Sequence, residues 1–186
     1  MYAMVQATAS VADEMQGFKI AYAQSDESSF LLTDYDTIET QGWFGYSLPK
    51  IVSISAALMS AHFNDHIGMA GPRAIFDARA FNVPPDEIAN YFLWRAKDWE
   101  RNSISMYAQA FFSHKELHGK NRSDMHEMLH DIGKNWADLR EDVKNGTFVL
   151  KGENGEIQVV SSVRPTFEAI DGIIRSTMVM EGDRDA

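Results

Sequence analysis

Three residues able to do chemistry stand together near the start of the chain: Ser25, Asp26 and Glu27, in a polar stretch between two apolar runs. Carboxylates on an exposed turn can hold a divalent cation, and Mg²⁺ prefers one or two protein carboxylates together with phosphate oxygens. Two-metal phosphoryl transfer uses such groups to clamp the attacking and leaving oxygens. The alternative is that Ser and Asp are here because both favour turns.

A second candidate is Lys50, which follows Pro49 in the first turn of a predicted helix. A helix N-terminus offers unpaired backbone N–H groups and the positive end of the helix dipole, so it can hold a triphosphate, and a lysine adds charge. The alternative is a solvated surface lysine.

The run His126-Glu127-Met128-Leu129-His130 matches H-E-x-x-H, in which two histidines one turn apart bind zinc and the glutamate acts as base. Gly133 also falls where the longer metalloprotease pattern has a glycine. The third ligand of that pattern would stand at Trp136, whose indole has no lone pair for a metal. Glu141 or Asp142 would have to replace it; otherwise the two histidines are polar residues of a short helix.

The block from Asn90 to Lys120 mixes basic and amide side chains with aromatic ones, a combination that suits phosphate and single-stranded RNA contacts. The alternative is that the aromatic residues belong to the core and the charges coat the surface. The candidates for nucleotide or RNA contacts are Arg101, Asn102, His114, Lys115 and Lys120.

The elements that must position these residues are read from hydrophobic spacing and from turn residues. The expected order is α-ββ-α-β-α-α-ββ-α, an α+β fold with helices packed on one face of an antiparallel sheet. In the helix that begins at Pro49, Ile51, Ile54, Leu58 and Ala61 predict a buried stripe. The expected helices are 1–15, from Pro49, 84–113, 123–132 and 167–180; the expected strands are 18–23, 29–33, 74–82, 147–151 and 157–161.

Composition excludes several classes of site. The chain has 186 residues and no cysteine, which rules out a disulfide framework, a thiolate metal site and a cysteine nucleophile. The first residues lack a signal peptide pattern and no apolar run reaches membrane-spanning length, so we expect a cytoplasmic protein without a membrane partner. The net charge of −10 excludes a generally basic nucleic-acid binder, but cations are concentrated between Arg95 and Arg122.

Taken in order, the motifs resemble the tRNA-His guanylyltransferase family of 3′-to-5′ polymerases. The matching segments run from Tyr22 to Lys151: AYAQSDESSFLL, FDARAFNVP, NYFLWRAKDWERNSISMYAQ, FSHKELHGK and NWADL…KNGTFVLK. The sequence E-R-N-S, which begins at Glu100, resembles the corresponding sequence of the bacterial and archaeal guanylyltransferase-like branch. That branch repairs truncated tRNA 5′ ends by templated addition.

The resemblance implies a ferredoxin-like polymerase palm, two Mg²⁺ ions, ATP or GTP as substrates, a tRNA partner and a homo-tetramer. It implies that Asp26 is a catalytic metal ligand supported by Ser25 and Glu27. Lys50 and Asn102 would bind the nucleotide, and Arg101, His114, Lys115 and Lys120 the tRNA. Residues 1–151 would form the palm-like catalytic domain, and 152–186 a C-terminal hairpin strand, helix and tail.

The family also places a strand upstream of the helix that here begins at Met1, and that strand carries a second metal-binding aspartate. We therefore expect a palm without its first strand, through a late start codon, a separately encoded N-terminal segment or decay. In the guanylyltransferase-like branch we also expect the sequence N-W-N-D-L, and here residues 135–139 read N-W-A-D-L, with Ala137 in place of the second asparagine. Two hypotheses follow: a nucleotidyltransferase that adds a nucleotide, typically G, to the 5′ end of tRNA, or a catalytically incomplete fragment that binds tRNA or a partner.

Overall fold

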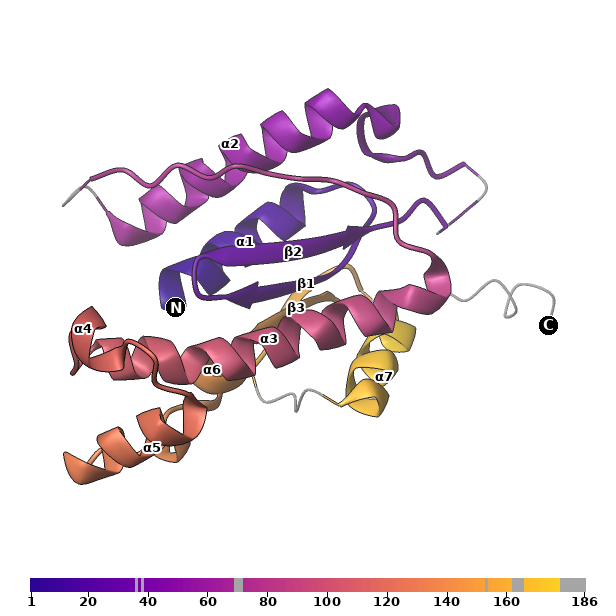
Figure 1. Ribbon diagram of the computed structural model, residues 1–186. Coiled ribbons are helices and arrows are strands. Elements are labelled where there is room, and N and C mark those ends of the chain that lie inside the picture. Colours follow the sequence, from indigo (N-terminus) through magenta and orange to yellow (C-terminus); the bar gives the residue numbers. More distant parts are fainter. Residues whose placement is uncertain (36, 38, 69–71, 153, 162–165, 178–186) are drawn as a thin grey trace.

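The computed structural model describes residues 1–35, 37, 39–68, 72–152, 154–161 and 166–177. A small sheet lies between helices on both of its faces (Figure 1). The strands are β1 (Phe18–Gln24), β2 (Glu27–Leu32), β3 (Thr147–Lys151) and β4 (Ile157–Val160). The helices are α1 (Tyr2–Glu14), α2 (Leu48–Ile67), α3 (Ile88–Gln109), α4 (His114–Leu117), α5 (Arg122–Asp131), α6 (Glu141–Asn145) and α7 (Phe167–Thr177).

The strands are antiparallel and lie in the order β2-β1-β3-β4. In the central pair, Ile20 lies opposite Leu150 and Ala23 opposite Thr147. Every residue of β1 is buried, whereas β2, at the edge of the sheet, is only partly covered. The antiparallel α+β class expected from the sequence is confirmed.

Helices cover both faces of the sheet, so the expectation of helices on one face was wrong. Ile20 and Tyr22 of β1 pack in the core formed with α3 and α7, while Ala21 packs in the core formed with α1 and α2. A register shift between Phe18 and Ile20 turns Phe18 to the same side as Ala21. Burial on both faces explains why β1 reads as an almost continuous apolar run.

The long helix α3 serves both the sheet and a smaller helical cluster. Its first half places Ile88 and Phe92 against the sheet. Its last turns, with Ile104 and Ala108, pack against α4 and α5 through Leu117 and Leu129. At about 1.5 Å per residue a helix of this length runs past the sheet, so residues near its middle face the β1–β2 turn.

Two local expectations were wrong. The predicted strand 74–82 pairs with no strand, because its backbone bonds to α2 side chains: Asn64 exchanges two hydrogen bonds with Ala74, and Ser60 Oγ accepts from the Phe76 N–H. In α2, Ile54 and Ala61 are exposed. The helix instead packs mainly on α1, and its buried residues are Met59 and Asn64.

The C-terminal elements join the same body as the rest. β4 pairs with β3, and Ile170 and Ile174 of α7 enter the core between α3 and the sheet. No helix in the described ranges has both the length and the apolar character needed to cross a bilayer.

Candidate active site

The turn between β1 and β2 holds the Ser25-Asp26-Glu27 motif. Gln24 and Glu27 are the last paired residues, which leaves a two-residue loop. Ser25 has φ of +47°, as such tight hairpin loops require positive φ values. The expected hairpin is confirmed, and Asp26 projects exposed from its tip.

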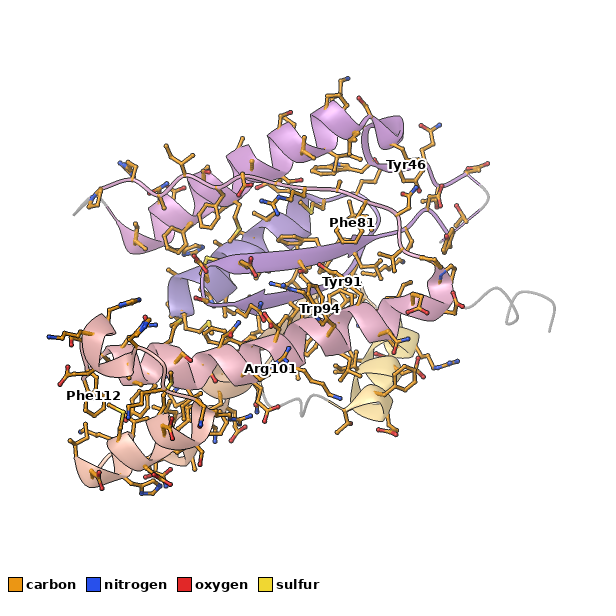
Figure 2. The ribbon with its side chains drawn as sticks, in the orientation of Figure 1. Tyr46, Phe81, Tyr91, Trp94, Arg101 and Phe112 are labelled. Carbon is orange, nitrogen blue, oxygen red and sulfur yellow. The ribbon has the colours of Figure 1, made fainter. Side chains whose placement is uncertain are left out.

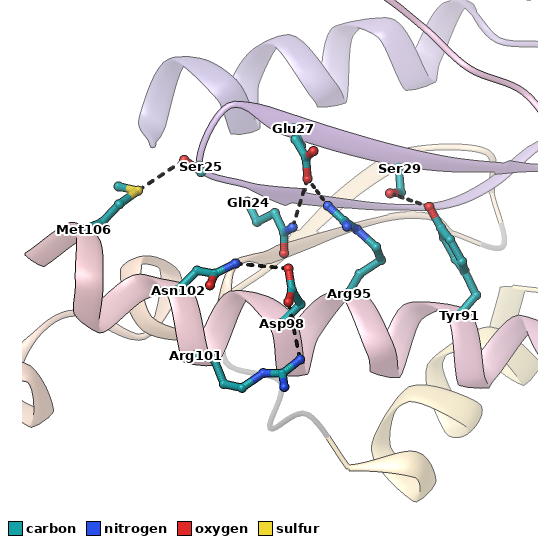
Figure 3. Close-up of polar contacts among 10 residues, drawn as sticks. All are labelled: Gln24, Ser25, Glu27, Ser29, Tyr91, Arg95, Asp98, Arg101, Asn102 and Met106. Atoms are coloured by element: carbon teal, nitrogen blue, oxygen red, sulfur yellow. Dashed lines mark hydrogen bonds and ion pairs between the residues drawn. The ribbon is translucent and has the colours of Figure 1, made fainter. Parts of the chain in front are cut away.

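The turn faces the middle of α3 across a hollow of about 290 Å³, which we call the turn hollow. Its lining combines the turn with one side of α3 (Figure 3). Ser25 Oγ donates to Met106 Sδ at 3.3 Å across one end. The lining residues are Gln24, Ser25, Asp26, Glu27, Arg95, Asp98, Trp99, Asn102 and Met106.

Glu27 is engaged within this site. Its carboxylate forms an ion pair with Arg95, whose side chain is only 13% exposed, and it accepts from Gln24 Nε2 at 3.3 Å. The other amide atom, Gln24 Oε1, is buried and has no hydrogen-bond partner in the described part of the chain. Glu27 thus fixes the turn to α3, and a buried oxygen beside it lacks a donor or a cation.

Asp98 organises the α3 side of the turn hollow. Its carboxylate accepts from Asn102 Nδ2 at 3.0 Å and from the Arg101 guanidinium at 3.4 Å. Both donors stand within four residues of it on the helix, so the aspartate orients two candidate ligand-binding side chains at once.

Lys50 is not brought to the turn hollow within this chain. The end of α2 lies along α1, where His66 approaches Ser10 at 3.4 Å, and α1 reaches the turn through Thr8 and Ser28. Lys50 precedes His66 by sixteen residues of helix, which is about 24 Å. The start of α2 accordingly lies at the far end of the hairpin from its turn (Figure 1).

The other predicted RNA contacts lie beyond the end of α3. His114 and Lys115 are exposed on α4, and Lys120 is exposed in the segment that follows. Leu117 anchors this region by packing against Ile104. None of these three candidates lines the turn hollow.

The zinc-protease alternative finds no support. The His126 ring lies edge-on to Trp136, with ring centroids 5.9 Å apart, and burial, Arg122 and His130 together lower the pKa of His126. Among the described residues, no three His, Asp or Glu side chains gather closely enough to hold a metal. The position that the motif reserves for the third ligand is filled by the indole itself.

Sequence reasoning missed the positioning residues of the turn hollow. Gln24 and Asp98 line it, yet neither was predicted as a site residue, and Arg95 was considered only as one basic residue of the block from Asn90 to Lys120. A signal was present on α3, because positions 95, 98 and 102 lie on one side of a helix. The hairpin alone could not show which side of the helix it would face.

Comparison with known proteins gives one consistent result. The sequence model of tRNAHis guanylyltransferase matches residues 1–84. A bacterial tRNA(His) guanylyltransferase-like protein solved in complex with ATP is 37% identical and superposes with a TM-score of 0.86, over 96% of this chain and 79% of that protein. Another such bacterial structure, in complex with GTP, is 32% identical with a TM-score of 0.75, over 96% and 77%.

The tRNA(His) guanylyltransferase of Saccharomyces cerevisiae shares the fold, with 19% identity and a TM-score of 0.60 over 80% of this chain and 73% of that one. No curated protein matches the chain significantly. The identity to the bacterial proteins extends over nearly the whole chain and most of theirs, and it agrees with the matched family model. The chain therefore belongs to the tRNA(His) guanylyltransferase family.

Proposed function

We propose that the chain is a nucleotidyltransferase that adds a nucleotide, typically G, to the 5′ end of a tRNA in the 3′-to-5′ direction with Mg²⁺. The observation that carries the proposal is that Asp26 and Asn102, from elements far apart in sequence, line one hollow. Two bacterial relatives were solved with ATP and with GTP, which supports a nucleoside triphosphate as the substrate. The catalytic residues belong to segment 1–151, and β4 and α7 complete its sheet and core.

The oxygen atoms around the turn hollow fit Mg²⁺. Asp26 and Asp98 supply carboxylates, and the buried Gln24 Oε1 lacks a partner in the described residues. Hard divalent cations take oxygen ligands of these types. Asp26 would hold the ion with Asp98 or Gln24 beside it, and bound Mg²⁺ would neutralise charge on the substrate phosphates.

The remaining residues of the turn hollow position the substrate. Asp98 occupies Nδ2 of Asn102 through one hydrogen bond, so the Asn102 carbonyl oxygen can meet the nucleotide in a fixed orientation. Arg95 holds Glu27, which keeps the turn against α3. The reaction joins the 3′ oxygen of the incoming nucleotide to the activated 5′ phosphorus of the tRNA and releases the activating group. Such catalysis consists mainly of positioning and charge stabilisation.

The test is incorporation of labelled GTP at the 5′ end of a tRNA that lacks its first nucleotide, with and without Mg²⁺. Wild-type protein should label the 5′ end only when Mg²⁺ is present. Asp26→Asn should reduce labelling by about 10²-fold or more, whereas Asp13→Asn, an exposed carboxylate on α1, should not change it. Absence of label with wild-type protein would refute the proposal.

A second candidate function is tRNA binding without nucleotide addition. One observation favours it: the third carboxylate of the turn hollow, Glu27, is already paired with Arg95. In this case a filter-binding titration would show RNA affinity that falls with salt and depends on Arg101 and Lys120. The same wild-type preparation would add no label.

We also propose that the chain acts as a homo-tetramer in which Lys50 serves a neighbouring copy. Within one chain Lys50 lies far from Asp26, with its ammonium over the Phe44 ring at 6.0 Å from the centroid. It stands in the first turn of a 20-residue helix, where an anionic triphosphate is stabilised.

A further inference from the structure

A second hollow, of about 490 Å³, lies on the outer side of α3, and we call it the Trp94 hollow. Asn90, Trp94, Lys97 and Arg101 follow one another at spacings of three and four, so they form a single stripe along the helix. Figure 2 shows Trp94 and Arg101 along this helix. The lining also includes Leu93 and Glu100 of α3 and Arg122 of α5.

Trp94 is more exposed than the other three tryptophans, of which Trp136 is half-buried. The surface of Trp94 is 54% exposed, whereas Trp43 and Trp99 are 7% and 3% exposed and belong to packed regions. Leaving a large aromatic ring in water forfeits the favourable free energy that its burial would contribute. Nothing in the described fold requires this ring to face solvent. Binding of a ligand to the ring would explain its exposure.

The indole is held in place from two sides. The Arg95 guanidinium lies over it, 5.0 Å from the ring centroid, and the Tyr91 ring lies 6.1 Å away. Tyr91 is fixed in turn by a 2.9 Å hydrogen bond between its hydroxyl and Ser29 Oγ. Trp94 is thus a preorganised surface, and a ligand that stacks on it loses little conformational entropy.

The charge of the hollow is positive in a protein of net charge −10. Lys97, Arg101 and Arg122 line the hollow; Arg122 pairs with Glu100 at 3.5 Å and Arg101 with Asp98 at 3.4 Å, which leaves the positive charge of Lys97. Lys97 is exposed and has no ion-pair partner in the ranges that the structure describes. An exposed aromatic ring flanked by cations is complementary to a nucleotide of a single strand, whose base stacks while its phosphates meet the charges.

We propose that the Trp94 hollow binds one unpaired nucleotide of an RNA strand, with the base on Trp94 and the adjacent phosphates against Lys97 and Arg101. The two cations stand one helical turn apart, about 6 Å along the axis, so the cationic surface extends from Trp94 along the helix. The identity of the RNA as tRNA rests on the proposed function. Arg95 bridges Trp94 to Glu27, so a strand held here would pass beside the turn hollow.

The test is fluorescence anisotropy of a short labelled oligoadenylate titrated with the full chain. Trp94→Ala should weaken binding by about 5- to 150-fold, as expected from a stacking contribution of roughly 1–3 kcal/mol per base, and Trp94→Phe should keep most of the affinity. Tyr2→Ala, which removes an aromatic ring that is 74% exposed on α1, should have no effect. Lys97→Gln should weaken binding and reduce the salt dependence by about one ion, whereas Lys134→Gln should do neither.

Three results would overturn the assignment: unchanged affinity of Trp94→Ala for the oligonucleotide, an equal loss of ATP and GTP affinity in that variant, or equally tight and Trp94-sensitive binding of duplex RNA. Trp94 is exposed, so the alanine variant should fold, and the loss of affinity and of salt dependence in Lys97→Gln tests the same hollow if it does not. Asp13→Asn, at an exposed position of α1 that lines neither hollow, should bind the oligonucleotide as the wild type does. If wild-type protein adds no nucleotide but Trp94→Ala still weakens RNA binding, only the proposed function fails.

Discussion

Arg95 of α3 and Glu27 of the hairpin turn form an ion pair in which the guanidinium side chain is nearly buried and the carboxylate is more than half exposed. The same guanidinium lies over the ring of Trp94. One side chain therefore connects the turn that carries Asp26 with the outer surface of α3.

Replacing Arg95 by Met should loosen the turn from α3 and reduce both stability and nucleotide addition. We expect a loss of about 1–2 kcal/mol in the free energy of unfolding, less than for a fully buried pair because Glu27 keeps contact with water. Urea denaturation measures it. Arg175→Met removes the surface pair with Asp171 on α7 and should leave the free energy of unfolding nearly unchanged; equal losses for the two variants would contradict the role given to Arg95.

Asn102 should determine nucleotide affinity more than the rate of addition. Asn102→Ala removes a side chain that Asp98 orients toward the turn hollow, and it should raise KM for the nucleotide about tenfold, as for one lost hydrogen bond from a neutral base or ribose donor to the Asn102 carbonyl oxygen. Gln109→Ala removes an exposed amide from the last turn of the same helix and is the matched control. Steady-state kinetics in which KM stays constant while kcat falls would assign Asn102 to the chemical step instead.

Tyr22 should make stability depend on alkaline pH. Burial raises the pKa of its phenol well above the ordinary value near 10, and the opposing effect of Arg95 is smaller. Above about pH 10 the unfolded chain releases this proton while the folded chain retains it, so the unfolded state is favoured and stability falls as pH rises.

Tyr22→Phe removes this dependence but also the 2.6 Å hydrogen bond from the hydroxyl to the Asn145 carbonyl oxygen. The variant should therefore be less stable at neutral pH by about 1–2 kcal/mol, and the difference should shrink above about pH 10. Urea unfolding at both pH values measures it. Tyr2→Phe, at an exposed position, should change neither value; a difference for Tyr22→Phe that grows with pH would mean that the sign is wrong.

The local elements around the site followed from sequence, because their signals are local. A polar stretch between two apolar runs predicted the β1–β2 hairpin, and apolar spacing after Pro84 predicted α3. The pairing of Glu27 with Arg95 could not be predicted in this way. It depends on which side of α3 packs on the sheet, and that is decided by tertiary contacts such as Phe92 of α3 with Phe148 of β3.

The expectation of helices on one face failed for a physical reason that the sequence contains. β1 reads Phe-Lys-Ile-Ala-Tyr-Ala and has little alternation, as a strand covered on both faces should. The predicted strand 74–82 failed because an extended segment becomes a strand only beside another strand, and Asn64 and Ser60 take its backbone groups first. The position of Lys50 relative to the hairpin turn could not be predicted from the sequence either, because it depends on how α2 packs along α1.

The separation of Lys50 from the turn hollow leads to a complementation experiment. If Lys50 serves a neighbouring copy, Lys50→Gln and Asp26→Asn should each abolish most nucleotide addition as pure proteins. Mixed oligomers from co-expression should regain part of it, because one copy supplies the intact lysine and the other the intact aspartate. Labelled-GTP incorporation by separately tagged, co-purified chains measures the gain, and a pair of Asp26→Asn chains is the control. If the mixed oligomers stay inactive, Lys50 does not act across copies. Lys50 lies about 24 Å along the helix from His66, at the end of α2 that is remote from the hairpin turn. Its role would then be away from the transferred nucleotide.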